Sequence, residues 1–221
     1  MKLLAIDTSE SVARWVGVTE EGPLDPQEVE AGKKHDILLA PGVRAWLDRN
    51  GWEKPDAVAV VVGPGGFTGL RVGVAFATGL AAAFGVPMVP VSLYEKLAAM
   101  CPSGKVWAIA WGGRDDVRAR LMQAGLEPKP LSDVTVCSIH NLTPPAGNDP
   151  LLPLGEGYNR NKEIVDKMLG ERLVSNPTLL SGALSLAHVA SYAYREGRMV
   201  SPTEVDVDYG ADFVPTPKKG S

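Results

Sequence analysis

The densest hydrophobic stretch of the chain, residues 58–84, predicts a strand, a glycine-rich turn and a helix. The β-branched run over 58–62 is short and ends at a turn, which is typical of a strand buried on both faces. Residues 69–84 are long enough for a helix, and after Arg71 the only polar residue is Thr78. A helix that is apolar nearly all round is expected to be buried on several sides, in a core or against another subunit.

The pattern along the rest of the chain predicts alternating strands and helices with a break near residue 102. Strands are expected over residues 3–7, 12–19, 27–32, 86–91, 106–111, 117–123, 134–139 and 151–155, and helices over 35–50, 92–100, 161–169 and 180–195. Because Pro102-Ser103-Gly104 reads as a turn, we expect a first half of residues 1–101 and a second of 102–214. Residues 215–221 are expected to form a disordered tail.

This order of elements indicates an α/β protein of the actin-like ATPase (ASKHA) superfold. Each half would be a ribonuclease-H-like unit, with a mixed sheet flanked by helices. We expect strand 58–62 to be central in the first sheet and helix 69–84 to pack beside helix 35–50. Asp36 is expected to cap the latter helix, and Asn50-Gly51 to end it.

Two helices offer apolar stripes that predict an interface. On helix 35–50 the apolar residues recur at helical spacing, and on helix 69–84 small residues share one stripe, so that a facing helix could approach closely. The predicted interface residues are Leu39, Val43, Trp46, Leu47, Val72, Ala75, Phe76, Gly79 and Ala83. A single such stripe is more often core, and that interpretation stays open.

The turn between strand and helix carries the most specific pattern. It consists of Gly63, Pro64, Gly65, Gly66, Phe67, Thr68 and Gly69, with Arg71 two residues further on. Neither a Gly-Lys-Ser/Thr ending nor the dinucleotide spacing is present. The loop is therefore either a packing turn or a holder of a partner or anion. Thr68 is expected to cap the helix, and Arg71, disfavoured by the helix dipole, needs an acidic partner or a bound anion.

Asp7, Thr8 and Ser9 follow the first strand, where the superfold places its phosphate-facing hairpin. An Asp with two hydroxyls suits a magnesium-bound phosphate, in which case these residues would be a vestigial nucleotide site. They equally suit a polar turn that bonds its own backbone.

Composition excludes several functions. The formal charge of −4 argues against a chain that grips nucleic acid by itself. Two cysteines outside any paired motif suggest neither a metal site nor a disulfide framework, and His35 reads as a helix-start residue. Glycine and prolines break the apolar run of the long helix, and no leader pattern precedes the first strand, so a soluble cytoplasmic protein is expected. No catalytic set is visible.

The glycine turn and its helix also carry a family resemblance. The run GPGGFTGLRVGVAFATGLA resembles the signature of the TsaB family, with Gly66 in place of the usual serine. LLAIDTS, HDILLAP and VPVSLYEKLA agree in order, so the resemblance covers residues 1 to about 99. In the second half, Trp111 stands where the family has an acid, residues 154–157 resemble a Gly-x-Gly loop, and residues 208–212 replace a Tyr-Leu-Arg motif.

The resemblance implies a non-catalytic subunit of the complex that makes threonylcarbamoyladenosine on tRNA. Its implied partners are a TsaD-like catalytic subunit, a TsaE-like ATPase and, when alone, a second copy, with tRNA bound only through the complex. Metal and ATP or carbamoyl-adenylate would sit in the partner, so no cofactor is expected in this chain and no peptidase activity, despite the family's older association with glycoproteases. The rival hypotheses are a free-standing actin-like kinase or ATPase, and an orphan homodimeric scaffold.

Overall fold

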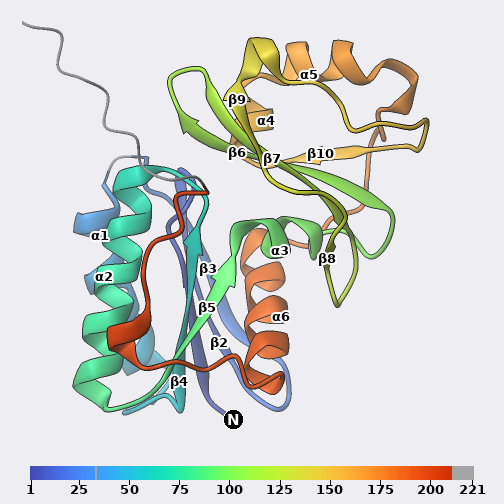
Figure 1. The fold of residues 1–221 in the computed structure, drawn as a ribbon. Coiled ribbons are helices and arrows are strands. Elements are labelled where there is room, and N and C mark those ends of the chain that lie inside the picture. Colours follow the sequence, from blue (N-terminus) through green and yellow to red (C-terminus); the bar gives the residue numbers. More distant parts are fainter. Residues whose placement is uncertain (33, 211–221) are drawn as a thin grey trace, which may run out of the picture.

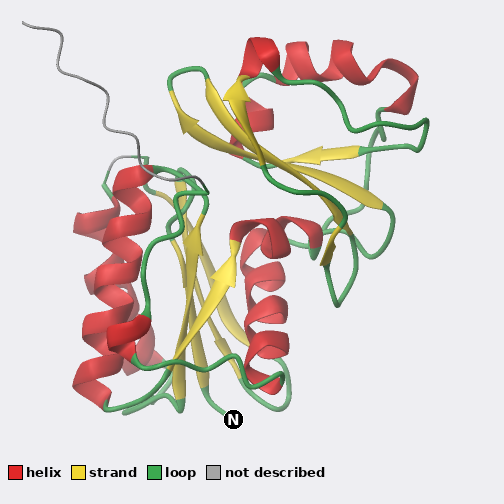
Figure 2. Ribbon diagram, viewed as in Figure 1, coloured by secondary structure: helices red, strands yellow, loops and turns green. Residues whose placement is uncertain are grey.

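Two lobes, each built on a five-stranded sheet, make up the computed structural model (Figure 1, Figure 2). The structure describes residues 1–32 and 34–210, and the predicted tail 215–221 lies outside them. The first sheet contains β1 (Leu3–Asp7), β2 (Val12–Val18), β3 (Pro23–Glu30), β4 (Ala57–Gly63) and β5 (Met88–Ser92). The second contains β6 (Lys105–Gly113), β7 (Asp116–Gln123), β8 (Lys129–Pro130), β9 (Thr135–Ser138) and β10 (Leu152–Leu154).

The first sheet has the order β3-β2-β1-β4-β5. β1 pairs antiparallel with β2 and parallel with β4, and β4 pairs parallel with β5. The centre is therefore β1, and the prediction that strand 58–62 is central is wrong by one position. The hairpin adds strands on one side of β1 and the helical crossovers add them on the other. β4 is nonetheless an interior strand with almost every residue buried, as its β-branched run predicts.

Helices cover both faces of the first sheet. α1 (His35–Arg49) and α2 (Phe67–Phe84) lie side by side on one face, which confirms their predicted packing (Figure 1). The other face is covered by α6 (Gly182–Arg195), which contacts four of the five strands. The sequence-based division placed α6 in the second half, so the described residues of that half, 102–210, do not form one structural unit. Small and apolar residues on α6 are buried against the first sheet, and this burial decides where the helix packs.

The second sheet has the order β10-β6-β7-β8, with β9 also paired to β7. α4 (Glu156–Arg160) and α5 (Lys162–Leu169) lie on one side of it, and α3 (Leu93–Ala98) packs on the other (Figure 1). Because α3 also contacts the first sheet, it joins the lobes, and a single hydrophobic core continues across them. Short 3-10 turns complete the chain: η1 (Ile139–Asn141), η2 (Gly170–Arg172) and η3 (Pro202–Glu204).

After α6 the chain returns along the first lobe. Val200 pairs with Met88 at the edge of β5, η3 contacts α2, and the amide of Asp208 donates to the carbonyl of Val62 at 2.8 Å. Figure 1 shows this last segment in red between α2 and the sheet. No sequence pattern predicted this return.

The structure tests the predicted ends of three helices. Ser92 caps α3 in a capping box with Glu95, where helix 92–100 was predicted to begin, and Asn50 with Gly51 ends α1, as expected. α2 instead begins one residue before Thr68, with Gly66 as its cap, and α1 has Lys34 at that position without a side-chain bond. Thr68 and Asp36 are therefore not caps, because each helix starts before the capping position that was predicted.

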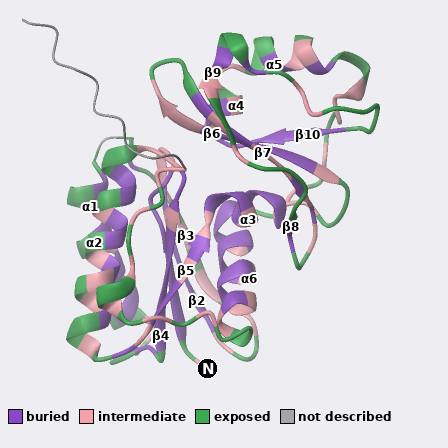
Figure 3. Cartoon of the chain, viewed as in Figure 1, coloured by how far each residue is buried: buried purple, intermediate pink, exposed green. Residues whose placement is uncertain are grey.

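α2 is less buried than its composition predicts. It packs on β4 through Gly69, Leu70, Gly73, Val74, Ala77 and Ala81, and its outer face is exposed (Figure 3). Only 33% of it is buried, although by length and composition it is the one helix among the described residues that could cross a membrane. The expectation of burial on several sides is thus not met within this chain.

Candidate functional site

A cleft of about 730 Å³ opens between the lobes at the carboxyl ends of β1 and β4. In open α/β sheets this edge is where ligands bind. The cleft is lined by the β1–β2 hairpin, the start of α2, the end of β6 and the start of α4. The lining residues are Thr8, Glu10, Ser11, Gly32, His35, Gly66, Phe67, Thr68, Gly69, Trp111, Gly112, Gly113, Glu156 and Arg160. Four segments that the sequence singled out separately therefore meet at one place.

Asp7 lies at the base of this region and is fully buried. Its Oδ2 accepts a hydrogen bond from Lys96 Nζ at 2.7 Å and one from Arg14 Nη1 at 3.3 Å. Its Oδ1 accepts from the amide and the hydroxyl of Ser9, at 2.8 and 2.6 Å. Burial alone would raise the pKa of Asp7, but the charges of Lys96 and Arg14 outweigh it and hold this pKa well below its usual range.

Glu10 extends this network to the second lobe. Its Oε2 accepts from Lys96 Nζ at 2.7 Å, and its Oε1 accepts from the amide of Glu156 at 3.0 Å. Glu156 in turn accepts from the amide of Ser11 at 2.9 Å and from Arg160 Nε at 2.8 Å. The hairpin of the first lobe and α4 of the second are therefore joined by charge-assisted hydrogen bonds, which are stronger than neutral ones.

These contacts favour the polar-turn interpretation of Asp7, Thr8 and Ser9. The carboxylate that would face a magnesium ion is paired with the ammonium group of Lys96. Thr8 Oγ1 donates to the carbonyl of Gly69 at 2.7 Å, and Ser9 bonds Asp7. Each side chain thus has a partner within the chain, as a turn that bonds its own surroundings requires.

The glycine turn is packed against the same hairpin. A Cβ at Gly69 would lie 2.2 Å from the carbonyl oxygen of Thr8, and one at Gly73 would lie 2.1 Å from its Oγ1. Only glycine allows α2 to approach this closely. A Cβ at Gly66 would meet only the carbonyl oxygen of Ser9, at 3.7 Å, so the serine that the family signature carries would fit there. The packing interpretation of the turn accounts for these glycines.

Arg71 is compensated by aromatic rings. Its guanidinium lies 3.9 Å from the ring centroid of Phe67, and its Nε donates to the hydroxyl of Tyr209 at 2.8 Å. The rings of Phe67 and Tyr209 are stacked at 5.4 Å. Within the described part of the chain Arg71 makes no ion pair, so the predicted acidic partner is not found there and cation–π contacts take its place.

His35 begins α1, as predicted, and is buried with its Nε2 3.0 Å from the carbonyl oxygen of Glu10. Among the described residues no three His, Cys, Asp or Glu side chains gather as a metal site.

The predicted interface residues separate into two groups. Leu39, Val43, Trp46 and Leu47 are at most 5% exposed and belong to the core beneath α1, so their predicted role at an interface is wrong. α1 packs against α2 and β2, and the whole stripe is buried there. On α2, by contrast, Ala75, Gly79 and Ala83 are exposed, and Val72 and Phe76 are half-buried. We call Ala75, Gly79 and Ala83 the α2 ridge.

We call Asp7, Ser9, Glu10, Arg14 and Lys96, which are joined by hydrogen bonds, the Asp7 network. The sequence analysis did not identify Lys96, Glu10 or Arg14 as members of it. Lys96 is fully buried on a short helix that is otherwise mostly apolar. A lysine in such a setting is a detectable sign of a buried ion pair, because an unpaired charge is rarely tolerated in a core.

Two lobes with this strand order, and a cleft at the carboxyl ends of the first sheet, define the actin-like ATPase fold. Ethanolamine utilization protein EutJ from Carboxydothermus hydrogenoformans shares the fold, with a TM-score of 0.50 and 13% identity over 86% of this chain and 89% of that chain.

More specific likenesses identify the family. The family model of TsaD, tRNA N6-adenosine threonylcarbamoyltransferase, matches residues 24–124. The tRNA threonylcarbamoyladenosine biosynthesis protein TsaB of Bacillus subtilis is 30% identical over 179 residues, which cover 78% of each chain. The structure of YeaZ from Pseudomonas aeruginosa matches with a TM-score of 0.77 and 26% identity, covering 94% of this chain and 99% of that one. The chain belongs to the TsaB family of tRNA threonylcarbamoyladenosine biosynthesis proteins.

Proposed function

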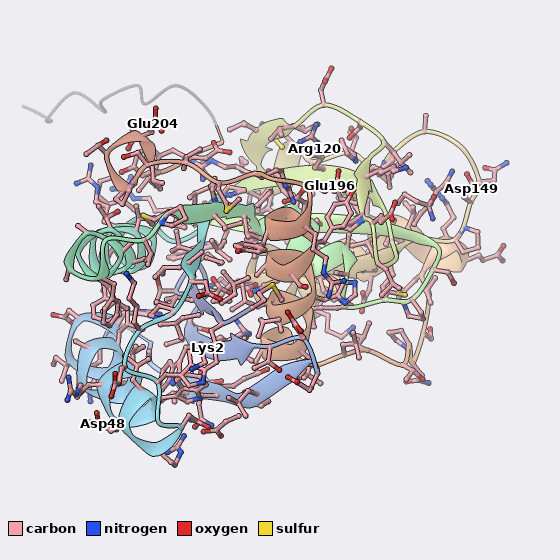
Figure 4. All side chains as sticks on the ribbon, turned by 90° about the horizontal axis from the view of Figure 1, so that it is seen from below. Lys2, Asp48, Arg120, Asp149, Glu196 and Glu204 are labelled. Atoms are coloured by element: carbon pink, nitrogen blue, oxygen red, sulfur yellow. The ribbon has the colours of Figure 1, made fainter. Side chains whose placement is uncertain are left out.

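We propose that this chain is a non-catalytic subunit that binds a TsaD-like catalytic protein through the α2 ridge and supports threonylcarbamoyl transfer to tRNA. The observation that carries the proposal is the exposed, nearly unbroken apolar face of α2. α2 lies between α1, which carries Asp48, and η3, which carries Glu204, and neither covers its outer side (Figure 4). Exposed apolar faces of this kind are typical of protein interfaces.

The α2 ridge is suited to a helix. Its three small residues recur every fourth position, so they form one row along α2. A Cβ at Gly79 would have no neighbouring atom within 4 Å. Small side chains let a facing helix approach closely and bury the surrounding half-buried Val72 and Phe76.

The Asp7 network supports a non-catalytic role. A carboxylate held by Lys96 and Arg14 is not free to position a metal-bound phosphate. The reacting metal, with ATP or carbamoyl-adenylate, would then be held by the partner, and no cofactor by this chain. A TsaE-like ATPase would join the same complex. The net charge of −4 supports binding of tRNA only through the complex, because little positive charge is available to neutralise phosphates. The complex would act in the cytoplasm.

Sedimentation of the chain with the TsaD-like protein of the same organism tests the proposal. We expect a heterodimer that Gly79→Arg abolishes, because a bulky charge would be buried without a partner, a loss of several kcal/mol. Gly79 is exposed, so circular dichroism of this variant should match the unmodified chain. Glu53→Arg, exposed and off the ridge, is the matched control and should assemble normally. Normal assembly of Gly79→Arg would place the interface elsewhere.

Two other functions make different predictions in the same experiments. If the chain is an orphan scaffold, it would form a homodimer that does not dissociate when the TsaD-like protein is added. As a kinase or ATPase, a function that the volume of the cleft favours, the isolated chain would hydrolyse ATP with magnesium, and Asp7→Asn would abolish this turnover. We expect no such hydrolysis, and a homodimer only in the absence of the partner.

A further inference from the structure

A second cavity, of about 290 Å³, lies in the seam between the lobes and shares no lining residue with the cleft. It is lined by the end of β4, by β5 and α3 of the first lobe, by β7 and β8 of the second, and by Arg198 after α6. Figure 4 labels Arg120, which belongs to β7, and Glu196, which precedes Arg198 by two positions at the end of α6. Both arginines line the cavity.

The cavity gathers buried hydrogen-bond donors that have no acceptor. Tyr94 is 3% exposed, lines the cavity, and its hydroxyl has no partner within the described chain. The Nε and Nη2 atoms of Arg198 are likewise buried and without a partner there. A buried polar group left unbonded is costly, so three such atoms on two side chains at one cavity point to an acceptor that residues 1–32 and 34–210 do not supply.

Among the described residues that line the cavity, Arg120 and Arg198 are basic and Glu95 is acidic. Both carboxylate oxygens of Glu95 are engaged, by Arg198 Nη1 at 2.8 Å and by the amide of Ser92 at 3.1 Å. Arg120 donates through Nε to the carbonyl of Ser132 at 2.9 Å, which holds its guanidinium in place.

Tyr94 also experiences the charges of neighbouring groups. Burial raises its pKa and Asp208 adds to this, while Arg118 and Arg120 act in the opposite direction. The phenol therefore keeps its proton at neutral pH and is available as a donor. Asp208 itself accepts from the amide of Gly210.

We propose that this seam cavity is a binding site for a small oxyanion of the phosphate class, held by Arg198, Arg120 and the hydroxyl of Tyr94. Guanidinium groups match the oxygens of phosphate in pairs, and the phenol adds a third donor. A cavity of about 290 Å³ has room for a phosphate group together with several water molecules. Because its walls come from both lobes, the bound anion would tie β7 to α3 and fix the angle between the lobes.

Titration of the isolated full chain with inorganic phosphate, at constant ionic strength set with chloride, tests the site. We expect saturable heat in calorimetry and a rise in melting temperature at millimolar phosphate. Arg198→Met and Arg120→Met should each weaken binding about tenfold or more. Tyr94→Phe should weaken it by a smaller factor and, because it removes an unbonded hydroxyl, leave the phosphate-free chain at least as stable.

Arg195→Met is the matched control, since Arg195 is exposed at the end of α6 and does not line the seam cavity. It should bind phosphate like the unmodified chain. Absence of binding at 20-fold higher phosphate, or equal binding by Arg198→Met and Arg195→Met, would overturn the proposal. A 5′-phosphorylated oligoribonucleotide that binds where free phosphate does not would also overturn it, because the site would then contact RNA.

Discussion

The Asp7 network and the α2 ridge both belong to the first lobe, yet they differ in how completely the chain covers them. The polar groups of the network are hydrogen-bonded within the chain, whereas the apolar side chains of the ridge are exposed to solvent. Asp7 is fully buried and engages both carboxylate oxygens within the chain. The α2 ridge is apolar, exposed and contacted by no other described element along its outer face. Asp7, one of whose two predicted roles was to face a phosphate, is therefore bonded within the chain, whereas the small residues of α2 that were predicted to form an interface are exposed.

This difference indicates at which of the two places binding of a partner would be more favourable in free energy. An external ion at Asp7 would have to replace Lys96, which already supplies a charge-assisted hydrogen bond at 2.7 Å. A helix on the α2 ridge replaces only water and buries apolar surface, which is favourable at roughly 25 cal/mol per Å². The comparison therefore favours protein association over nucleotide binding, and the following predictions test each side of it.

The largest effect is expected for Lys96→Met, which leaves Asp7 buried with Arg14 alone. Removing one partner of a buried ion pair costs about 3–5 kcal/mol in free energy of unfolding, and Arg14 should hold the loss near the lower value. Urea denaturation measures it. Asp7→Asn in the same background should recover part of the loss, since it removes the stranded charge. Lys162→Met, which breaks the exposed pair with Asp166, is the control and should cost less than about 1 kcal/mol.

Two glycines of α2 should respond in opposite directions to alanine. Gly69→Ala places a Cβ against the carbonyl of Thr8 and should destabilise the chain by about 1–3 kcal/mol. Gly79→Ala meets open space and should stabilise it by about 0.5–1 kcal/mol, because alanine favours the helix. Thermal unfolding of the isolated chains measures both. If both variants change the melting temperature by the same amount in the same direction, the difference in packing between Gly69 and Gly79 is contradicted.

Acid should weaken the network gradually. The folded-state pKa of Asp7 lies below its usual range, so the native chain binds fewer protons than the unfolded chain at mildly acidic pH. The stability from Asp7 is present above the unfolded pKa near 4 and is lost as pH falls below it, by at most about 1.4 kcal/mol per pH unit. Asp7→Asn should flatten this part of the profile, measured by urea unfolding between pH 3 and 6. An unchanged slope would contradict the role given to Asp7.

The sequence by itself determined the strands, the helices and the family. Local patterns are enough to predict the β-branched strand β4, the apolar stripe of α1 and the glycine turn. Each depends only on the types and spacing of residues that are close in sequence. The TsaB-like signature indicated the family, which the comparisons confirm. The polar hairpin at Asp7 could be recognised but not interpreted, because its two explanations require the same residues.

Only the tertiary structure decided which apolar face is core and which polar group is satisfied. Both α1 and α2 carry an apolar stripe that the sequence analysis assigned to an interface. In the structure the stripe of α1 is completely buried, whereas α2 buries only the side that faces the sheet. Lys96 reaches Asp7 across 89 positions of sequence, and α6 returns from beyond the second sheet to cover the first. Such outcomes depend on how elements distant in sequence compete for the same surface, and this competition is not encoded in any local pattern.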